Sequence, residues 1–187
     1  MRRLHAGKLF GLETTVAPAA LAWHGGLALV AAGLAAWPLG LSAPAALAAG
    51  LLSAVVFFVS EWLHQAGHAL AAWRVGHPMR GIHYFSLFSG SVYPAEEPAL
   101  PRRVHVLRSL GGFCVNVLLG SVLAVWALSA WPQGGLGAWL LAFGAVANLF
   151  VLGLGALLPI SVPGGDGLTD GGALLKHWRE SRMKAEG

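Results

Sequence analysis

Four long apolar stretches, separated by short polar or Pro- and Gly-rich segments, dominate the hydrophobic pattern of the chain. They cover Ala17–Trp37, Ala45–Trp73, Val106–Trp131 and Leu136–Pro159. Each is long enough to supply the roughly 20 apolar residues with which an α-helix crosses the hydrocarbon layer of a bilayer. The pattern therefore predicts an all-α integral membrane protein with four transmembrane helices. No repeat and no change of composition divides the chain, so we expect residues 1–187 to form a single polytopic domain.

Two segments outside these stretches show other patterns. Between the second and third stretches, the loop 76–101 contains Gly81–Tyr93, which is rich in aromatic and β-branched residues and has Gly90 at an expected turn or bulge. This segment predicts a small β-hairpin, or alternatively an aromatic anchor lying at the membrane interface. After the fourth stretch, a Gly- and Pro-rich turn leads into a short helix expected over about residues 170–183.

Composition and charge agree with the membrane prediction and orient the chain. Hydrophobic residues make up 56% of the sequence and charged residues 11%, against about 25% charged in soluble domains. The twelve Lys and Arg residues all lie at the N-terminus, in the segment 74–108 or in the tail after Lys176. With four spans these regions share one side, which the positive-inside rule makes cytoplasmic. We expect a bacterial or archaeal cell-membrane protein with both termini in the cytoplasm.

The positive charge does not indicate nucleic-acid binding. The sequence pI is near 9.8, but no basic face with interleaved aromatic residues stands outside the cytoplasmic regions. The excess charge is typical of contact with anionic lipid headgroups. The single cysteine, Cys114, lies in a predicted span and has no second cysteine with which to form an internal disulfide. The Arg-rich start runs into the four-span pattern and does not predict a cleavable signal peptide.

The second stretch carries an unusual cluster of polar side chains. One face of the predicted helix holds Glu61, His64, Gln65 and His68, because a helix returns to nearly the same face every four residues. His64 lies ten residues before Arg74, roughly 15 Å from the cytoplasmic end of the helix. Ionisable side chains at such depth are costly and usually mark a functional site. Two imidazoles at positions i and i+4 predict a metal site, and the alternative is a polar stripe that bonds neighbouring helices.

A zinc site needs a third protein ligand and an open fourth position. Asp166 and Asp170 are the carboxylates near the end of another span, in the Gly- and Pro-rich turn after the fourth stretch. Irregular backbone at membrane depth is tolerated where it lines a protein cavity, which suits a metal site. Alternatively, the segment is a plain exit turn in which Asp170 caps the final helix. Either aspartate can serve as the third ligand.

Three segments, in this order along the chain, resemble known motifs. They are His64-Gln-Ala-Gly-His68, then Arg108-Ser-Leu-Gly-Gly-Phe-Cys-Val-Asn116, and last Asn148 with Leu157-Leu-Pro-Ile160 and Asp170-Gly-Gly172. They resemble H-E-x-G-H, Gly-Pro-x-x-Asn and Asn-Leu-Leu-Pro…Asp-Gly-Gly of the site-2 protease family, which are intramembrane zinc metalloproteases. Lys8-Leu-Phe-Gly11 is weakly similar to the amino-terminal segment of that family. The likeness covers the second to fourth predicted spans.

The resemblance implies a cofactor, a substrate class and a set of site residues. The cofactor is Zn²⁺, held by His64, His68 and Asp170, with Asp166 as the alternative third ligand. The substrate is a membrane-embedded peptide or single-span protein, cleaved near the cytoplasmic side. Asn148, or Asn116 as a second candidate, would hydrogen-bond the substrate backbone or the oxyanion. The expected hairpin would offer its edge to an unwound substrate segment.

The chain departs from the family motifs at Gln65, which stands where the family has the glutamate that acts as general base. Phe113 replaces a proline and Ala156 an asparagine, and the step from the Leu-Leu-Pro element to either aspartate is longer. An amide can orient water but cannot accept a proton near neutral pH. Glu61, on the same helix face, is a possible substitute base. A deliberate Glu→Gln replacement would leave the same sequence.

Three functions are therefore compatible with these residues. The first is a zinc metalloendopeptidase of the site-2 type, in which Glu61, or Glu96 or Glu97 from the loop, compensates for Gln65. The second is a catalytically impaired relative that binds metal and partner helices without turnover. The third is an ion carrier that uses the buried Glu and His side chains.

Overall fold

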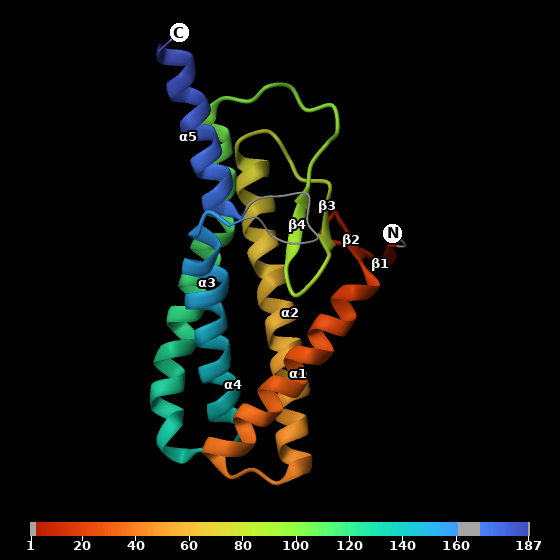
Figure 1. Cartoon of the computed structure of the whole chain (residues 1–187), viewed down its shortest axis with the longest axis vertical. Coiled ribbons are helices and arrows are strands. Elements are labelled where there is room, and N and C mark those ends of the chain that lie inside the picture. The colour runs from red at the N-terminus through yellow and green to blue at the C-terminus, as the bar shows by residue number, and fades with distance from the viewer. Residues whose placement is uncertain (1–2, 161–168, 187) are drawn as a thin grey trace.

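The structure is a computed structural model that describes residues 3–160 and 169–186. Its main body consists of four apolar helices, of which the last three in chain order run along the long axis of the molecule and the first lies oblique to it (Figure 1). They are α1 (Pro18–Leu39), α2 (Ala43–Arg74), α3 (Arg102–Ala130) and α4 (Gly135–Val146). The 3-10 turn η1 (Trp131–Gln133) joins α3 to α4, which continues through the π-helical η2 (Ala147–Gly153) and the 3-10 turn η3 (Leu154–Leu157). The prediction of four helices long and apolar enough to cross a membrane is confirmed.

The helical body has apolar side chains outside and polar side chains inside. Trp37 is 92% exposed and Leu128 is 78% exposed, whereas His64, His68 and both asparagines of the helices are buried. Among the side chains that the structure describes, the buried polar ones of the helices are Ser53, Ser60, Glu61, His64, Gln65, His68, Arg108, Asn116 and Asn148. Soluble proteins place such residues the other way round. Extended apolar surfaces of this kind suit contact with lipid, and they support a membrane protein.

A small mixed sheet lies beside one end of α2 (Figure 1). Its strands are β1 (Leu4–Leu9), β2 (Leu12–Val16), β3 (Gly81–Tyr84) and β4 (Ser89–Val92), in the spatial order β1-β2-β3-β4. The two hairpins are antiparallel, and β2 pairs with β3 in parallel. The connections between α1 and α2 and between α3 and α4 lie at the opposite end of the molecule.

The sheet is larger than the sequence indicates. The hairpin expected within Gly81–Tyr93 is present as β3 and β4, but a second hairpin precedes it, so the fold is not all-α with one hairpin. Gly90 is not at the turn, because it lies within β4 opposite His83. The chain reverses direction just before β4, where the Phe85 amide donates to the Phe88 carbonyl at 3.3 Å.

The helices α2 and α3 approach closely at a pair of glycines. A Cβ atom added to Gly67 would meet the carbonyl oxygen of Gly111, and one added to Gly111 would meet that of Gly67. The absence of side chains at both positions allows backbone-to-backbone contact, as at other close helix crossings in membranes. The crossing brings the start of α3 against the polar face of α2.

Candidate metal centre

Three side chains from two elements meet beside this crossing. His64 and His68 project from consecutive turns of α2, and Asp170 is the first residue of α5 (Asp170–Glu186). The two Nε2 atoms lie 2.9 Å apart. Asp170 Oδ2 lies 3.4 Å from His64 Nε2, and Oδ1 lies 3.3 Å from His68 Nε2. Both histidines are buried and Asp170 is nearly so, which makes this an enclosed cluster.

Hydrogen bonds on the far side of each ring decide where the ring protons lie. His64 Nδ1 is 2.9 Å from Asn116 Oδ1, and His68 Nδ1 is 2.7 Å from the carbonyl oxygen of Arg108. Both oxygens accept, so each Nδ1 carries the proton and donates it. The Gly112 amide nitrogen is also near His68 Nδ1, but at the longer distance of 3.3 Å. The two Nε2 lone pairs and the carboxylate therefore converge, and a proton or a metal cation between them relieves their repulsion.

The geometry of the cluster fits zinc. The three ligand atoms lie within 4.8 Å of one another, and the contacts above run from 2.9 to 3.4 Å. Ligands of a tetrahedral zinc ion at about 2.0–2.1 Å are about 3.3 Å apart. Among the described residues, Asp170 Oδ2 is buried without a hydrogen-bond partner, and a bound cation would give this oxygen one. Two histidines and one carboxylate leave a fourth position for water or substrate.

Asp170 is kept ionised in this position. Burial raises the pKa of its carboxyl group, but when the site holds no metal the facing His64 and His68 rings, once protonated, outweigh burial and lower the pKa to about 2. A carboxyl group with this pKa is negative at neutral pH and needs no deprotonation before it binds a cation.

Thr169 places Asp170 beside the histidines. The Thr169 amide donates to the Ile160 carbonyl at 3.1 Å, and the Ile160 amide donates to Thr169 Oγ1 at 3.2 Å. The same hydroxyl oxygen accepts from the Gly172 amide at 3.3 Å, so Thr169 rather than Asp170 caps the final helix. Asp166, the other predicted third ligand, lies outside the described residues.

The buried amide side chains of Asn116 and Asn148 form a line of hydrogen bonds that ends at His64 Nδ1. Asn116 Nδ2 donates to Asn148 Oδ1 at 2.8 Å, and Asn148 Nδ2 donates to Ser60 Oγ at 2.9 Å and to the Gly144 carbonyl at 2.8 Å. Both asparagines are fully buried. The two amides thus bond to each other, to α2 and to α4, and their predicted contact with substrate stays a prediction.

Gln65 and Glu61 point toward the sheet. Glu61 Oε1 accepts from the amide and from the hydroxyl of Ser89, both at 2.7 Å. Gln65 Oε1 accepts from the Ser91 hydroxyl at 2.7 Å, and its Nε2 donates to the Ser89 carbonyl at 3.4 Å. In the described part of the chain, neither side chain belongs to the cluster of ligand atoms formed by the two histidines and Asp170.

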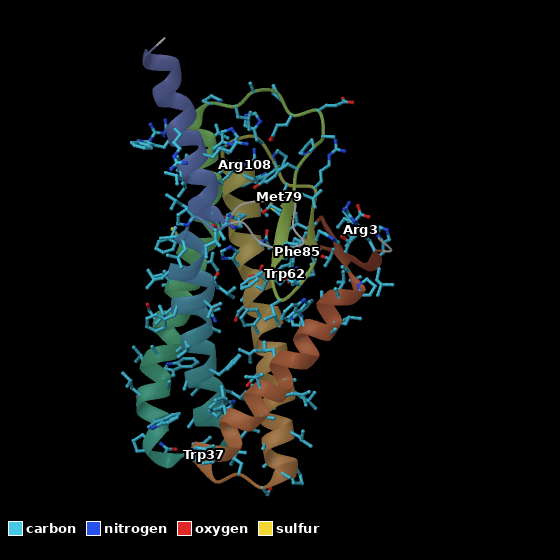
Figure 2. The ribbon with its side chains drawn as sticks, viewed as in Figure 1. Arg3, Trp37, Trp62, Met79, Phe85 and Arg108 are labelled. Carbon is cyan, nitrogen blue, oxygen red and sulfur yellow. The ribbon has the colours of Figure 1, made fainter. Side chains whose placement is uncertain are left out.

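Arg108 is a site residue that sequence reasoning missed. Its guanidinium group donates to both carboxylate oxygens of Glu97 at 2.9 and 3.0 Å and lies 3.3 Å over the ring of Tyr93. Figure 2 shows Arg108 at the sheet end of the helices, where its carbonyl oxygen also holds His68. This pairing fixes the loop to α3. It also engages both carboxylate oxygens of Glu97, which was one of the suggested substitute bases. The signal available in the sequence was an arginine inside the apolar stretch Val106–Trp131.

Gly112 is a second missed residue. A Cβ atom there would lie 2.6 Å from His64 Cε1 and from the Nε2 atoms of both histidines. Only glycine leaves room for the two rings at this position of α3. The Gly111–Gly112 pair was visible in the sequence, but its place opposite the histidines was not.

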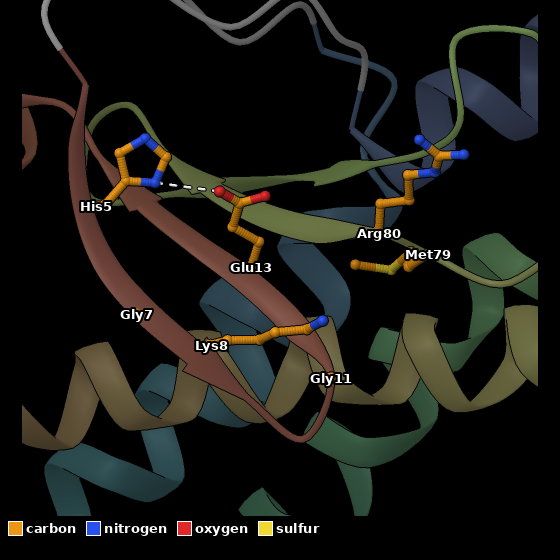
Figure 3. Close-up of a pocket in the computed structure, with 7 residues that line it drawn as sticks. All are labelled: His5, Gly7, Lys8, Gly11, Glu13, Met79 and Arg80. Carbon is orange, nitrogen blue, oxygen red and sulfur yellow. Dashed lines mark ion pairs between the residues drawn. The ribbon is translucent and has the colours of Figure 1, made fainter.

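A surface cavity of about 520 Å³ lies elsewhere, at the outer hairpin of the sheet (Figure 3). Its lining is His5, Gly7, Lys8, Gly11, Glu13, Met79 and Arg80. His5 and Glu13 form an ion pair across the hairpin, with Nδ1 and Oε1 3.1 Å apart. None of these residues belongs to the group formed by His64, His68 and Asp170.

The fold has a solved counterpart. Neither a family model nor a curated protein matches the chain by sequence. The structure is similar to that of the Site-2 Protease from Methanocaldococcus jannaschii, with a TM-score of 0.62 over 96% of this chain and 73% of that chain. The sequence identity is 17%, so the likeness shows a shared fold. That fold is the one expected from the motifs around the two histidines.

Proposed function

We propose that the chain is an intramembrane zinc metalloprotease of the site-2 type, acting on membrane-embedded peptides or single-span proteins near the cytoplasmic side of the bilayer. The observation that carries the proposal is the convergence of His64, His68 and Asp170, whose ligand atoms lie within 4.8 Å of one another inside an apolar helical body. The fold shared with a site-2 protease supports it.

The residues around the cluster have distinct tasks in this proposal. His64 and His68 offer Nε2, because Asn116 and the Arg108 carbonyl hold the Nδ1 protons. Asp170 offers a carboxylate from the start of α5. Zinc at these ligands would supply a Lewis acid that polarises a substrate carbonyl and lowers the pKa of water. The shared fold, and the gathering of Lys and Arg residues in segments on one side of the predicted spans, favour a site that opens to the cytoplasm. Both termini would lie on that side.

Gln65 lowers the rate of peptide-bond cleavage that we expect, compared with a chain that has glutamate at this position. It stands where the family resemblance places the general base, and its amide cannot take a proton from water near neutral pH. Glu61 does not replace it readily, because its Oε1 holds two donors of Ser89. The absence of a general base typically reduces the rate by about 10²–10⁴-fold. Slow cleavage is therefore the expected behaviour of the unaltered chain.

A second candidate function rests on the same side chain. The Gln65 amide is bonded through both its oxygen and its nitrogen to β4, which gives it a structural task that needs no proton transfer. This observation favours a non-hydrolytic relative that binds zinc and partner helices without turnover.

A cleavage assay separates the two functions. The purified chain, the Gln65→Glu variant and the His64→Ala variant are reconstituted with zinc and a single-span reporter protein. Slow cleavage by the unaltered chain that disappears in His64→Ala supports the protease. Cleavage by Gln65→Glu alone supports the non-hydrolytic relative, and no cleavage by either chain contradicts the protease.

A further inference from the structure

The strand β4 forms the edge of the sheet nearest α2. It pairs with β3 on one side only, in the order β1-β2-β3-β4. The register places Tyr84 opposite Ser89, and the neighbouring pair is joined by the Phe85 amide donating to the Phe88 carbonyl. In an antiparallel ladder, hydrogen-bonded and non-hydrogen-bonded pairs alternate. Ser89 therefore turns its amide and carbonyl away from β3, toward the outer edge.

Those two outward groups are already bonded by side chains of α2. The Ser89 amide donates to Glu61 Oε1 at 2.7 Å, and the Ser89 carbonyl accepts from Gln65 Nε2 at 3.4 Å. Glu61 thus supplies an acceptor and Gln65, one helical turn later, supplies a donor. A neighbouring β-strand would offer the same two kinds of group to Ser89 from its backbone. The Ser89 and Ser91 hydroxyls donate to the same two side chains at 2.7 Å and hold them in place.

We propose that Glu61 and Gln65 form a latch that occupies the outer edge of β4 and must release Ser89 before an extended peptide backbone can pair there. The inferred ligand of this edge is a β-strand segment, recognised through main-chain hydrogen bonds. That the segment comes from a protease substrate rests on the proposed function. The latch itself is a property of the chain alone.

The latch gives the Gln65 amide a specific role. Only a side chain with both an acceptor and a donor can serve the Ser91 hydroxyl and the Ser89 carbonyl together. A carboxylate at this position would keep the bond from Ser91 but would face the Ser89 carbonyl with an oxygen, and two acceptors do not bond. Gln65→Glu therefore opens half of the latch while preserving the shape of the side chain.

Two measurements on the full chain in lipid nanodiscs test the latch. Residue-resolved hydrogen exchange reports the Ser89 amide, and a fluorescent octapeptide of alternating Thr and Val reports binding at the edge. In Glu61→Ala the Ser89 amide is expected to exchange on the order of tenfold faster, because it loses its acceptor. Octapeptide affinity is expected to rise by about fivefold in Glu61→Ala, Gln65→Ala and Gln65→Glu, since the peptide no longer displaces the latch.

The matched control is Ser53→Ala. Ser53 is also buried on α2 and accepts a hydrogen bond, from Trp139 Nε1 at 2.9 Å, without contacting β4. It should change neither measurement, so general loosening of α2 is told apart from release of the edge. If Glu61→Ala does not fold, the two Gln65 variants carry the peptide measurement.

Faster exchange with tighter peptide binding supports the latch whether or not the protein cleaves anything, and cleavage is read separately in the reporter assay. Unchanged octapeptide affinity in all of the folded latch variants overturns it. So does Ser89 exchange in folded Glu61→Ala that matches that of the unaltered chain.

Discussion

The Oδ1 atom of Asn116 lies 2.9 Å from Nδ1 of His64, and this contact sets which nitrogen of the ring faces the candidate metal site. With the proton held on Nδ1, the Nε2 lone pair points toward Asp170 and His68. Asn116 is itself held by Asn148, so the orientation of one ligand depends on a line of polar groups that crosses three spans. Partners of this kind commonly tune metal affinity.

Asn116→Ala is therefore expected to weaken zinc binding by about 10–100-fold, because the His64 ring loses the acceptor that fixes its tautomer. Competition titration with a chromophoric chelator measures the affinity. Ser121→Ala, on the same helix but bonded only to the Val117 carbonyl one turn away, serves as the control and should bind zinc normally. Equal affinities for the two variants would contradict the role given to Asn116.

Gly112→Ala is expected to disturb the site by steric pressure. Its methyl group would lie 2.6 Å from the ring atoms of His64, and relief of that overlap should cost about 1–3 kcal/mol of unfolding free energy as well as zinc content. Zinc analysis and thermal unfolding measure the two effects. Gly137→Ala on α4 has open space around the added methyl group and should leave both unchanged. Normal zinc content in Gly112→Ala would show that the rings are not confined as described.

The choice between the two predicted aspartates can be tested directly. Asp170→Asn should lose zinc at equilibrium, because its carboxylate oxygens lie 3.3 and 3.4 Å from the two Nε2 atoms. Asp166→Asn should keep it. Metal analysis after dialysis against zinc-buffered solution distinguishes them, and the reverse pattern would assign the third ligand to Asp166.

Glu97→Gln is expected to loosen the loop that covers the start of α3. The change leaves Arg108, a residue that is only 6% exposed, without its anionic partner. The unfolding free energy should fall by about 1–3 kcal/mol, as for other buried groups deprived of a charged hydrogen bond. The neighbouring Glu96→Gln serves as the control in the same thermal unfolding series. Identical unfolding midpoints for the two variants would argue against a structural role for the Arg108–Glu97 pair.

Much of the fold was predictable because its signals are local. Four apolar stretches predict four helices, and the i, i+4 spacing of His64 and His68 predicts their shared face. The parallel pairing of β2 with β3 could not be predicted, because β3 lies far along the chain and no local pattern encodes such a partner. Gly90 was misplaced because glycine marks turns and also tolerates strand interiors.

The site was predictable only in its ligand types. Sequence spacing indicates that Asp170 is close to the end of a span, but not that Thr169 holds it beside the histidines. It also does not show that Glu61 and Gln65 turn toward Ser89, because this depends on how the sheet sits against α2. Likewise, the sequence does not show that the amide groups of Asn116 and Asn148 bond to each other, because this contact depends on how α3 packs against the π-helical η2.

The most direct test is the zinc content of the purified protein. After incubation with zinc and removal of loosely bound metal, the unaltered chain should retain about one zinc ion per chain, and His64→Ala and Asp170→Asn should retain almost none. A folded, unaltered chain that holds no more zinc than these two variants would contradict a metal site built from the histidines of α2 and the first residue of α5.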